Sequence, residues 1–366
     1  MSMFPAIDLN GSAFERGRQH GERARARVER SLGNYARLFA FVGMAWDEAQ
    51  RRAAPFGEVI GNFDAALLDE IEGIARGAGR PFGELLALNA RTEILPASFL
   101  TGADLGECTA IAVAPAASAT GGTLLAQNWD WVGSQRESMV ILRIAEDGHP
   151  ACVTLTEAGM LAKIGFNAQG FGVCLNILRS VFDRGEPGVP VHVLLRALLR
   201  RASVRDAIEF CSKLSFGGSS NILCADRGGD TASLEFSPRG VCALRAEGGT
   251  LCHTNHFLHP DTADWQAQQA PNLSSLPRLA RAHGHATARP KHGVDDLKAL
   301  LRDESDGLLS ICRMPDRSLP PEAQLETVAS VIVELGRSVM HVAPDVPSRT
   351  EYRPVRLVSE GEIALA

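Results

Sequence analysis

Three residues that could do chemistry lie within two neighbouring apolar runs. Cys108 opens the first run, and Asn128 and Asp130 lie in the second. Both runs are typical of buried strands, and the small, glycine-ended stretch between them is typical of a hairpin connection. A turn centred near Ala119 would place Asp130 opposite Cys108 and Asn128 opposite Ala110, all on one face of the sheet. We therefore expect a thiol, a carboxylate and an amide to share one patch.

The polar side chains of Asn128 and Asp130 indicate that Cys108 is more than a core residue. A free cysteine in a strand is ordinarily a small hydrophobic core residue. Asn128 and Asp130, in contrast, are costly to bury unless they form hydrogen bonds. Their expected position on the same face as Cys108 favours a nucleophilic thiol over an inert one. The alternative for Asp130 is a strand-end residue that caps a turn.

A second group of chemically active residues has the spacing H-x-x-H-x-x-H, formed by His253, His256 and His259. Imidazoles bind zinc, so a zinc-dependent hydrolase is one alternative function. A period of three in a strand that runs into a loop does not place three rings on one face, because strands alternate by two. No H-E-x-x-H helix accompanies the motif. We expect no metal site, and a non-catalytic binding module remains the other alternative.

The elements that must position these residues change in character at Cys108. Before it, charged and alanine-rich patterns predict helices over 12–39, 62–76 and 82–94, with Ser12 at capping-box spacing from Glu15. After it, the pattern predicts strands over 123–131, 138–145, 151–157, 161–166 and 171–177, helices over 190–201 and 203–214, strands over 219–226, 230–236, 241–246 and 250–254, helices over 276–282 and 294–302, and strands over 326–335, 337–343 and 352–358. This order predicts an α+β domain of two sheets with helices outside.

Composition excludes several classes of function. The 366 residues carry a net charge of −6, which argues against nucleic acid as a partner because such proteins present a basic face. The N-terminal residues lack the features of a signal peptide, and no apolar run is long enough to cross a membrane. The eight cysteines are scattered without a C-x-x-C pair, which is typical of reduced thiols. We therefore expect a cytoplasmic protein.

A set of motifs in a fixed order gives the chain a family resemblance. The motifs are Glu107-Cys108-Thr109, Gln127-Asn128-Trp129-Asp130, Gly165-Phe166-Asn167-Ala168-Gln169-Gly170, Val173-Cys174-Leu175-Asn176, His253-Thr254-Asn255-His256-Phe257, Ser274-Ser275-Leu276-Pro277-Arg278-Leu279-Ala280-Arg281 and Ile311-Cys312-Arg313-Met314-Pro315-Asp316, preceded by Leu88-Asn89-Ala90-Arg91-Thr92-Glu93. In this order they resemble the cysteine-type N-terminal-nucleophile (Ntn) hydrolases, and among these the isopenicillin N acyltransferase branch, which is peptidase C45-like.

The resemblance implies a four-layer αββα fold and activation by autoproteolysis between Glu107 and Cys108. Residues 1–107 would form a helical section and residues 108–366 the αββα core, and the two fragments would associate. Cys108 would then carry a free α-amine, whose pKa of about 7.7–8.0 suits a general base. The fungal acyltransferase has glycine before its cysteine, where this chain has Glu107.

The resemblance also implies roles for individual side chains. Asp130 would hold the α-amine and the thiol, Asn255 would donate to the oxyanion, and Arg278 would lie near the nucleophile and lower its pKa. Asn255 as an ordinary loop residue and Arg278 as a solvent-facing helix residue are the alternatives. Gln127 and Asn128 would contact the substrate.

The motifs also include Gln127, Arg91 and Glu93. Gln127 stands where the bile salt and penicillin V hydrolases carry arginine, which disfavours their substrates. Arg91 and Glu93 are interpreted as a structural ion pair of the N-terminal section. The predicted function is an amidohydrolase or N-acyltransferase that acts on carbon–nitrogen amide bonds of small acylated substrates through a Cys108 acyl-enzyme. The reaction would need no cofactor, although acyl-CoA is a possible co-substrate. The sequence does not determine whether water or an amine accepts the acyl group, or whether the protein forms a homo-oligomer.

Overall fold

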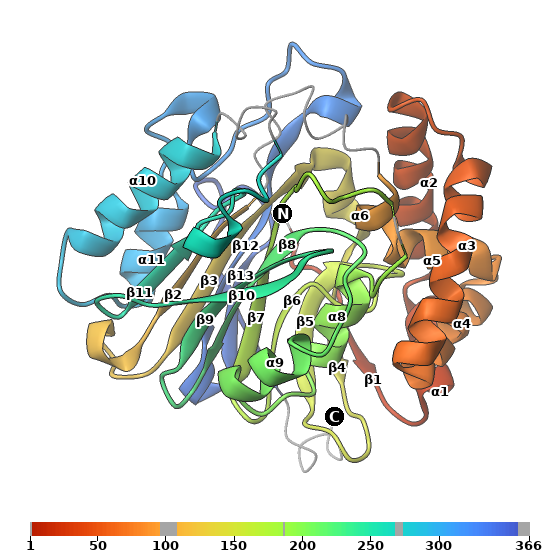
Figure 1. Ribbon diagram of the computed structural model, residues 1–366, viewed down its shortest axis with the longest axis horizontal. Coiled ribbons are helices and arrows are strands. Elements are labelled where there is room, and N and C mark those ends of the chain that lie inside the picture. The colour runs from red at the N-terminus through yellow and green to blue at the C-terminus, as the bar shows by residue number, and fades with distance from the viewer. Residues whose placement is uncertain (1, 96–107, 186, 268–273, 358–366) are drawn as a thin grey trace.

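Two β-sheets packed face to face form the centre of the protein (Figure 1). The computed structural model describes residues 2–95, 108–185, 187–267 and 274–357. Within these residues one sheet has eight strands, in the order β1 (Ala6–Leu9), β4 (Met139–Ile144), β5 (Cys152–Glu157), β6 (Ile164–Asn167), β7 (Phe171–Ile177), β8 (Ser220–Asp226), β9 (Thr231–Ser237) and β10 (Gly240–Arg245). The other has six, in the order β11 (Thr250–His253), β2 (Cys108–Val113), β3 (Leu124–Val132), β12 (Leu325–Glu334), β13 (Val339–Ala343) and β14 (Arg353–Arg356).

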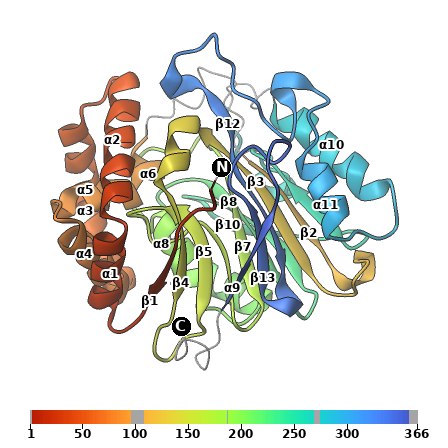
Figure 2. The same cartoon turned by 180° about the vertical axis from the view of Figure 1, so that it is seen from behind.

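Helices cover the outer faces of both sheets. The N-terminal group comprises α1 (Ala13–Arg23), α2 (Arg25–Phe41), α3 (Trp46–Phe63), α4 (Ala65–Ala78), α5 (Phe82–Asn89) and α6 (Arg91–Ile94), and the later helices are α8 (Val191–Leu198), α9 (Val204–Cys211), α10 (Ser275–Thr287) and α11 (Val294–Leu301). Helices α10 and α11 pack on the six-stranded sheet, and α9 packs on the eight-stranded sheet. Figures 1 and 2 show the N-terminal group, in red and orange, on the opposite side of the sheets from α10 and α11. The structure is therefore the predicted four-layer αββα arrangement with a helical N-terminal section.

Alternation along β2 and β3 separates the two sides of the six-stranded sheet. Ala110, Leu125 and Trp129 join the core between the sheets, whereas Ile111 and Ala126 join a second core beneath α10 and α11. Successive strand residues point to opposite faces, so each residue of these strands can be assigned to the inner or outer face by its parity. This assignment decides which side chains can meet at Cys108.

Helices α1 and α4 approach each other unusually closely through glycines. A Cβ atom on Gly17 would lie 2.0 Å from the Glu70 carbonyl oxygen, and one on Gly73 would lie 2.2 Å from the Phe14 carbonyl oxygen. Gly21 and Gly77 repeat this contact one turn further along. Only residues without a side chain allow two helix backbones to meet at such distances. The spacing holds Arg16 of α1 against Glu70 of α4.

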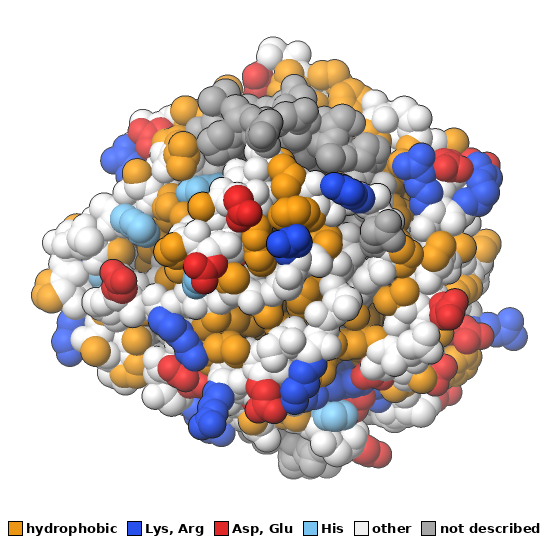
Figure 3. Space-filling model, in the orientation of Figure 1, with side chains coloured by type: hydrophobic (Ala, Val, Ile, Leu, Met, Phe, Trp, Pro, Cys, Tyr) orange, Lys and Arg blue, Asp and Glu red, His pale blue; other side chains and the backbone are white. Residues whose placement is uncertain are grey.

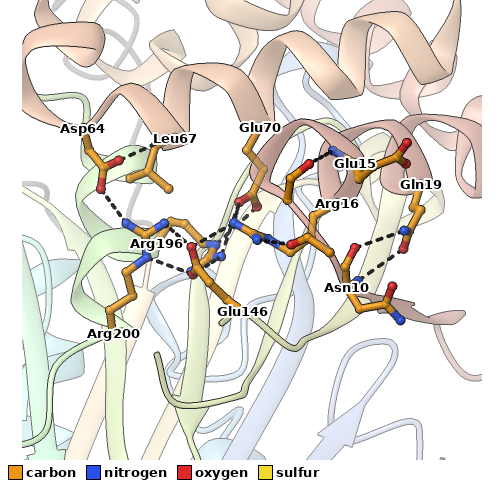
Figure 4. A network of polar contacts seen from close by, with 12 residues as sticks. Asn10, Glu15, Arg16, Gln19, Asp64, Leu67, Glu70, Glu146, Arg196 and Arg200 are labelled. Carbon is orange, nitrogen blue, oxygen red and sulfur yellow. Dashed lines mark hydrogen bonds and ion pairs between the residues drawn. The ribbon is translucent and has the colours of Figure 1, made fainter. Parts of the chain in front are cut away.

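A buried network of charges joins the N-terminal helices to the core (Figure 4). Arg16 binds Glu70 at 3.0 Å and Glu146 at 2.9 Å, although Glu146 follows β4. Arg196 of α8 reaches the same two carboxylates at 3.3 and 2.8 Å. Arg200 binds Glu146 at 2.6 Å and pairs with Asp64. Three guanidinium groups therefore face three carboxylates across the boundary between the segments before and after Cys108.

The observed elements differ from the predicted ones mainly before Cys108. The predicted helix over 12–39 is divided at Ala24 into α1 and α2, although Ser12 caps its start as expected. Strand β1 and helix α3 were not predicted. Every strand predicted after Cys108 is present, and no helix of the described ranges is both long and apolar enough to cross a membrane.

Candidate active site

Cys108 is the first residue of β2 and is buried between the two sheets. Strand β2 pairs with β3 on one side and β11 on the other, so Cys108 lies inside the six-stranded sheet. The pKa of Cys174, in β7 of the facing sheet, is raised by burial and then by the nearby Cys108 thiol. Glu107, the other half of the predicted cleavage site, lies outside the described residues.

Buried polar side chains converge on the backbone of Cys108. Its amide nitrogen donates to Asn255 Oδ1 at 3.0 Å. Its carbonyl oxygen accepts from Arg278 Nη1 at 2.7 Å and from Asn176 Nδ2 at 3.0 Å. Arg278 also links the group together, because its Nη2 donates to Asn255 Oδ1 at 2.9 Å. The backbone nitrogen of Cys108 is thus held by Asn255, and its carbonyl oxygen by Arg278 and Asn176.

These side chains are themselves held in place by further hydrogen bonds. The Asn255 amide nitrogen donates to the Ile177 carbonyl oxygen at 3.0 Å, which fixes the orientation of the side-chain amide. The Asn255 backbone N–H donates to Ser275 Oγ at 2.8 Å, at the start of α10. Arg278 is fully buried on α10 and not solvent-facing. The sequence motifs therefore identified two residues, Asn255 and Arg278, that the fold brings to Cys108.

Asn176 also lies at the site, although the motif that contains it predicts no role for this residue. It lies in β7 and crosses to β2 of the other sheet, where it donates to the Cys108 carbonyl. Asn221 Nδ2 donates to Asn176 Oδ1 at 3.2 Å, and Ser233 Oγ donates to Asn221 Oδ1 at 2.6 Å. The signal in the sequence is a single amide in an otherwise apolar strand, which needs a partner when buried.

The hairpin register differs by one residue from the predicted one. Cys108 is opposite Trp129, and Ala110 is opposite Gln127. The pairing of Val113 with Leu124 centres the connection between Ser118 and Ala119, because a 3₁₀ turn and a serine turn shape this loop. A slip of one residue moves every side chain of a strand to the other face. The prediction that Cys108, Asn128 and Asp130 share one face was therefore wrong.

Asn128 and Asp130 instead point towards the outer helices. Asn128 Nδ2 donates to the carbonyl oxygens of Leu301 and Ile311 at 2.8 and 2.9 Å. Asp130 Oδ1 accepts from Thr327 Oγ1 at 2.6 Å, at a bulge in β12. Both residues are fully buried. The amide of Asn128 thus ties β3 to the outer layer, and the structure does not bring it to Cys108.

Gln127 is on the inner face but binds the backbone of the facing sheet. Its Oε1 accepts from the Leu175 N–H at 3.0 Å, and its Nε2 donates to the Leu175 carbonyl oxygen at 2.5 Å. These two bonds tie β3 to β7 immediately next to Asn176. Gln127 therefore holds the two sheets together at the site.

Trp129 and Lys163 form a neighbouring feature that sequence reasoning missed. Trp129 is directly opposite Cys108, and Lys163 Nζ lies 3.8 Å from the centre of its ring. Lys163 is only 2% exposed, so this cation lies inside the protein next to the strand that carries the thiol. A cation over an indole face is an attractive arrangement. The sequence signal is a lone lysine in a predicted buried strand.

Arg91 and Glu93 do not form the expected ion pair with each other. Arg91 pairs with Glu157 at 3.5 Å and lies over the Tyr35 and Trp131 rings. Glu93 Oε1 accepts from the Val191 N–H at 2.8 Å. Both residues link the N-terminal section to the core, because Glu157 and Val191 follow Cys108. The interpretation of an internal pair was wrong, since each side chain points across the boundary.

Comparison with known proteins shows the family of the chain. The model of the acyl-coenzyme A:6-aminopenicillanic acid acyl-transferase family matches residues 118–341. The chain belongs to this family. The 40 kDa form of an acyl-coenzyme A:6-aminopenicillanic-acid-acyltransferase from Emericella nidulans is 30% identical over 322 residues, which are 84% of each chain. The family predicted from the motifs is thus confirmed, and the protein is an enzyme of an acyltransferase and amidohydrolase family.

Two solved structures resemble the chain more distantly. A conjugated bile acid hydrolase from Clostridium perfringens has a TM-score of 0.49 and 12% identity, and covers 68% of this chain and 92% of its own. A penicillin V acylase from Agrobacterium tumefaciens has a TM-score of 0.44 and 13% identity, and covers 64% of this chain and 82% of its own.

The three histidines of the H-x-x-H-x-x-H segment have separate partners. His253 Nε2 lies 2.8 Å from Glu235 Oε1, and His256 Nδ1 lies 2.7 Å from Ser275 Oγ. His259 Nδ1 accepts from the Asp261 N–H at 3.1 Å. No cluster of three or more metal-binding side chains is found in the part of the chain that the structure describes. The segment instead shapes the loop that carries Asn255.

The other cysteines are unsuited to nucleophilic chemistry. All eight cysteines are free thiols, as expected from their spacing. Burial raises the pKa of Cys152 and of Cys312 to about 11, and that of Cys252 to about 12. The pKa values of the remaining four are also raised by burial: Cys174, Cys211, Cys224 and Cys242. Because the thiolate is the reactive form, these seven thiols are suppressed at neutral pH.

Proposed function

We propose that Cys108 is the nucleophile of an autoproteolytically activated acyltransferase or amidohydrolase. The observation that carries this proposal is the convergence of Asn255, Arg278 and Asn176 on the backbone of this one residue. Buried amide and guanidinium groups are costly to place without a purpose. Cys108 also stands at the boundary between the helical section and the two-sheet core.

Activation would begin with attack of the Cys108 thiol on the carbonyl carbon of Glu107. The peptide C–N bond breaks, a thioester forms between the Glu107 carbonyl and Sγ, and the Cys108 nitrogen takes up a proton to become an amine. Water then hydrolyses the thioester, which releases the Glu107 carboxylate and restores the thiol. Asn255 Oδ1 already accepts from this nitrogen, so it is placed to hold the new amine.

In turnover, the free α-amine would act as the base for its own thiol. The thiol attacks the carbonyl of an amide or thioester substrate, the leaving amine or thiol departs, and an acyl-enzyme forms on Sγ. Water or an amine then takes the acyl group. Arg278 and Asn255 keep the backbone and the amine in position. The name of the Emericella relative makes acyl-CoA a candidate acyl donor, and no further cofactor is needed for these steps.

The remaining predicted residues have narrower parts in this proposal. The role of Asp130 rests on the family resemblance alone, because the register directs its side chain to the outer face. The oxyanion role of Asn255 would use its side-chain nitrogen, which also donates to Ile177. Substrate contacts by Gln127 and Asn128 are not part of the proposal, because both side chains bind backbone groups of neighbouring elements.

After cleavage, residues 1–107 would stay bound to residues 108–366. Strand β1 pairs with β4 in the eight-stranded sheet, although it belongs to the first fragment. The charge network contributes ion pairs across the same boundary: Arg16 to Glu146, Arg196 to Glu70 and Arg200 to Asp64. Both contacts support a two-fragment enzyme that remains assembled.

The intact mass of the denatured protein tests this proposal. Wild-type protein should give two masses that break between Glu107 and Cys108. Cys108→Ala should give one full-length species without activity. Cys242→Ala, which removes another strand thiol, should still give two masses. A wild-type protein that stays whole and yet turns over substrate would refute the mechanism.

Chemical labelling provides a second test, directed at the thiol. A thiol-alkylating reagent should abolish the activity of wild type and of Cys242→Ala alike, and mapping should place the label that accompanies this loss on the peptide that begins at Cys108. Activity should survive prolonged chelation. Loss of activity on chelation with recovery on adding zinc would favour the alternative of a metal enzyme.

A further inference from the structure

Lys163 is a buried cation close to the strand that carries Cys108. The chain has four lysines, and the other three, Lys213, Lys291 and Lys298, are exposed or half-buried. Charged side chains of both signs are spread over the face of the molecule that Figure 3 shows. Lys163, in contrast, is 2% exposed. A lysine is rarely buried unless its charge interacts with a neighbouring group, so a specific role is expected for this charge.

The indole ring of Trp129 connects Lys163 to Cys108. Cys108 and Trp129 are directly opposite each other in the pairing of β2 with β3, and both belong to the core between the sheets. Residues opposite each other in an antiparallel pair have neighbouring side chains on the same face. Lys163 immediately precedes β6 of the facing sheet, and its Nζ lies 3.8 Å from the centre of the Trp129 ring. The ammonium is therefore one aromatic side chain away from the thiol.

The surroundings of Lys163 fix the position of its ammonium. The backbone N–H of Lys163 donates to Thr154 Oγ1 of the neighbouring strand β5 at 3.2 Å. Its Nζ also lies 5.8 Å from the centre of the Trp131 ring, so the cation contacts two indoles. The attraction of a cation to an aromatic face is strongest where water is excluded. Trp129 Nε1 has no hydrogen-bond partner among the described residues, so packing and this cation hold the ring.

Several elements direct titratable or charged groups towards Cys108. Arg278 of α10 binds its carbonyl oxygen, and the Cys174 thiol of β7 lies near its thiol. The carboxylate of Asp130 in β3 belongs to the outer face of the sheet, where it accepts from Thr327. Arg278 is thus a second cation at Cys108, on the side opposite the inner layer that contains Lys163.

The charges around Lys163 itself come from three other elements. Arg91 of α6 lies over the far indole, that of Trp131, and pairs with Glu157 of β5 at 3.5 Å. Glu157 also accepts from the Tyr35 hydroxyl at 2.6 Å, so this carboxylate is committed to the N-terminal section. His192 of α8 is neutral, because burial, Arg91 and Lys163 hold its pKa well below the usual value. The environment of the thiol on this side is therefore cationic.

We propose that Lys163 is a positioning residue whose buried ammonium favours the thiolate form of Cys108 and, after cleavage, the neutral form of its α-amine. For the amine this inference rests on the proposed function, whereas the effect on the thiol depends on the fold alone. A cation stabilises a nearby anion and opposes a second cation, so both effects keep the thiol reactive and the amine basic. A charge at about 4–6 Å shifts a pKa by about 1–3, and one side chain further away the effect should be about one pH unit.

The rate of alkylation of Cys108 as a function of pH tests the effect on the thiol. The rate rises with pH as the thiolate forms, and mass mapping of the peptide that contains Cys108 excludes the other cysteines. The midpoint should rise by about one pH unit in Lys163→Met and in Lys163→Gln, and should stay at the wild-type value in Lys163→Arg, which keeps the charge. Lys298→Met is the matched control, because Lys298 lies over the Tyr352 ring in the outer layer. It should leave the midpoint unchanged.

Turnover separates this inference from the proposed function. The acidic limb of the kcat/KM profile against pH, measured with pentanoyl-p-nitroanilide, reports the base of the free enzyme and should move up by about one pH unit in Lys163→Met. A shifted alkylation midpoint in proteins that neither cleave nor turn over would uphold the role of Lys163 and refute the nucleophile. An unchanged midpoint in both neutral variants, or an equal shift in Lys163→Arg or Lys298→Met, would overturn the role of Lys163 even in an active enzyme.

Discussion

Glu146 is the carboxylate on which the charge network between the two sections depends. Its two oxygens contact Arg16, Arg196 and Arg200 at 2.9, 2.8 and 2.6 Å. Burial by itself would raise the pKa of Glu146, but the facing guanidinium groups hold it at about 2. Glu146→Gln keeps the shape of the side chain and removes its charge. Three buried arginines would then face only Glu70 and Asp64.

The expected cost follows from the pKa of this carboxyl. A folded-state pKa of about 2 against an ordinary value of 4.5 corresponds to about 3 kcal/mol of stability at neutral pH. Removal of one partner from a buried ion pair costs a similar amount, about 3–5 kcal/mol. Because the folded-state pKa is lowered, this contribution is present above pH 4.5 and is lost as the pH falls towards 2. The Gln variant should lack that part of the acid dependence.

Urea unfolding at pH 7, followed by circular dichroism, measures the effect. The free energy of unfolding of Glu146→Gln should fall by about 3 kcal/mol. Glu209→Gln is the control, because its ion pair with Lys213 is exposed and such pairs contribute about 0–1 kcal/mol. If the two variants lose the same small amount, the network does not hold the sections together.

Three further predictions address other parts of the molecule. Gly73→Ala should lower the free energy of unfolding by about 3 kcal/mol or more, because its Cβ would overlap the α1 backbone. The control Gly33→Ala, in α2, should not destabilise the protein. Thermal unfolding compares the two variants, and equal effects would contradict the close contact between α1 and α4. Asn255→Ala should still fold, and its kcat should fall by a factor of about 10²–10³, the typical cost of removing one oxyanion donor. A kcat near that of wild type would show that Asn255 is an ordinary loop residue. Since the pKa of Glu93 is raised to about 7, its contribution to stability should be complete below pH 4.5 and decline as the pH rises to 7. Glu93→Gln should remove this decline when unfolding is measured as a function of pH. An unchanged slope of stability against pH would show that Glu93 is not the titrating group.

The layered fold could be predicted because its signals are local. Apolar runs bounded by turn residues predict every strand after Cys108. Each such strand can be predicted from its own residues, without knowing which strand it pairs with. Strand β1 was missed because it is short and pairs with β4, far along the chain, as a parallel edge. Helix α3 was missed although it is long; Pro55 lies inside it. Such features depend on distant contacts or run against local preference.

The site could be predicted in part for the same reason. Asn255 and Arg278 were found through motifs, whereas the role of Asn176 became visible only once β7 was packed against β2. The register of β2 against β3 depended on one residue of loop geometry. The sequence of the loop does not distinguish a turn centred on Ala119 from one centred between Ser118 and Ala119. That difference decided the faces to which Asn128 and Asp130 belong.

The place of β1 has a consequence for how the protein must be made. β1 covers the edge of β4, whose residues Met139, Val140, Ile141 and Leu142 are all buried. A chain that started at Cys108 would expose this apolar edge with unpaired N–H and C=O groups, which invites pairing with other chains and aggregation. By pairing with β4, strand β1 of the N-terminal section keeps this edge from pairing with other chains. Synthesis of β1 and the core in one chain ensures that the protecting strand is present, in equal amount and at high local concentration, whenever the core folds.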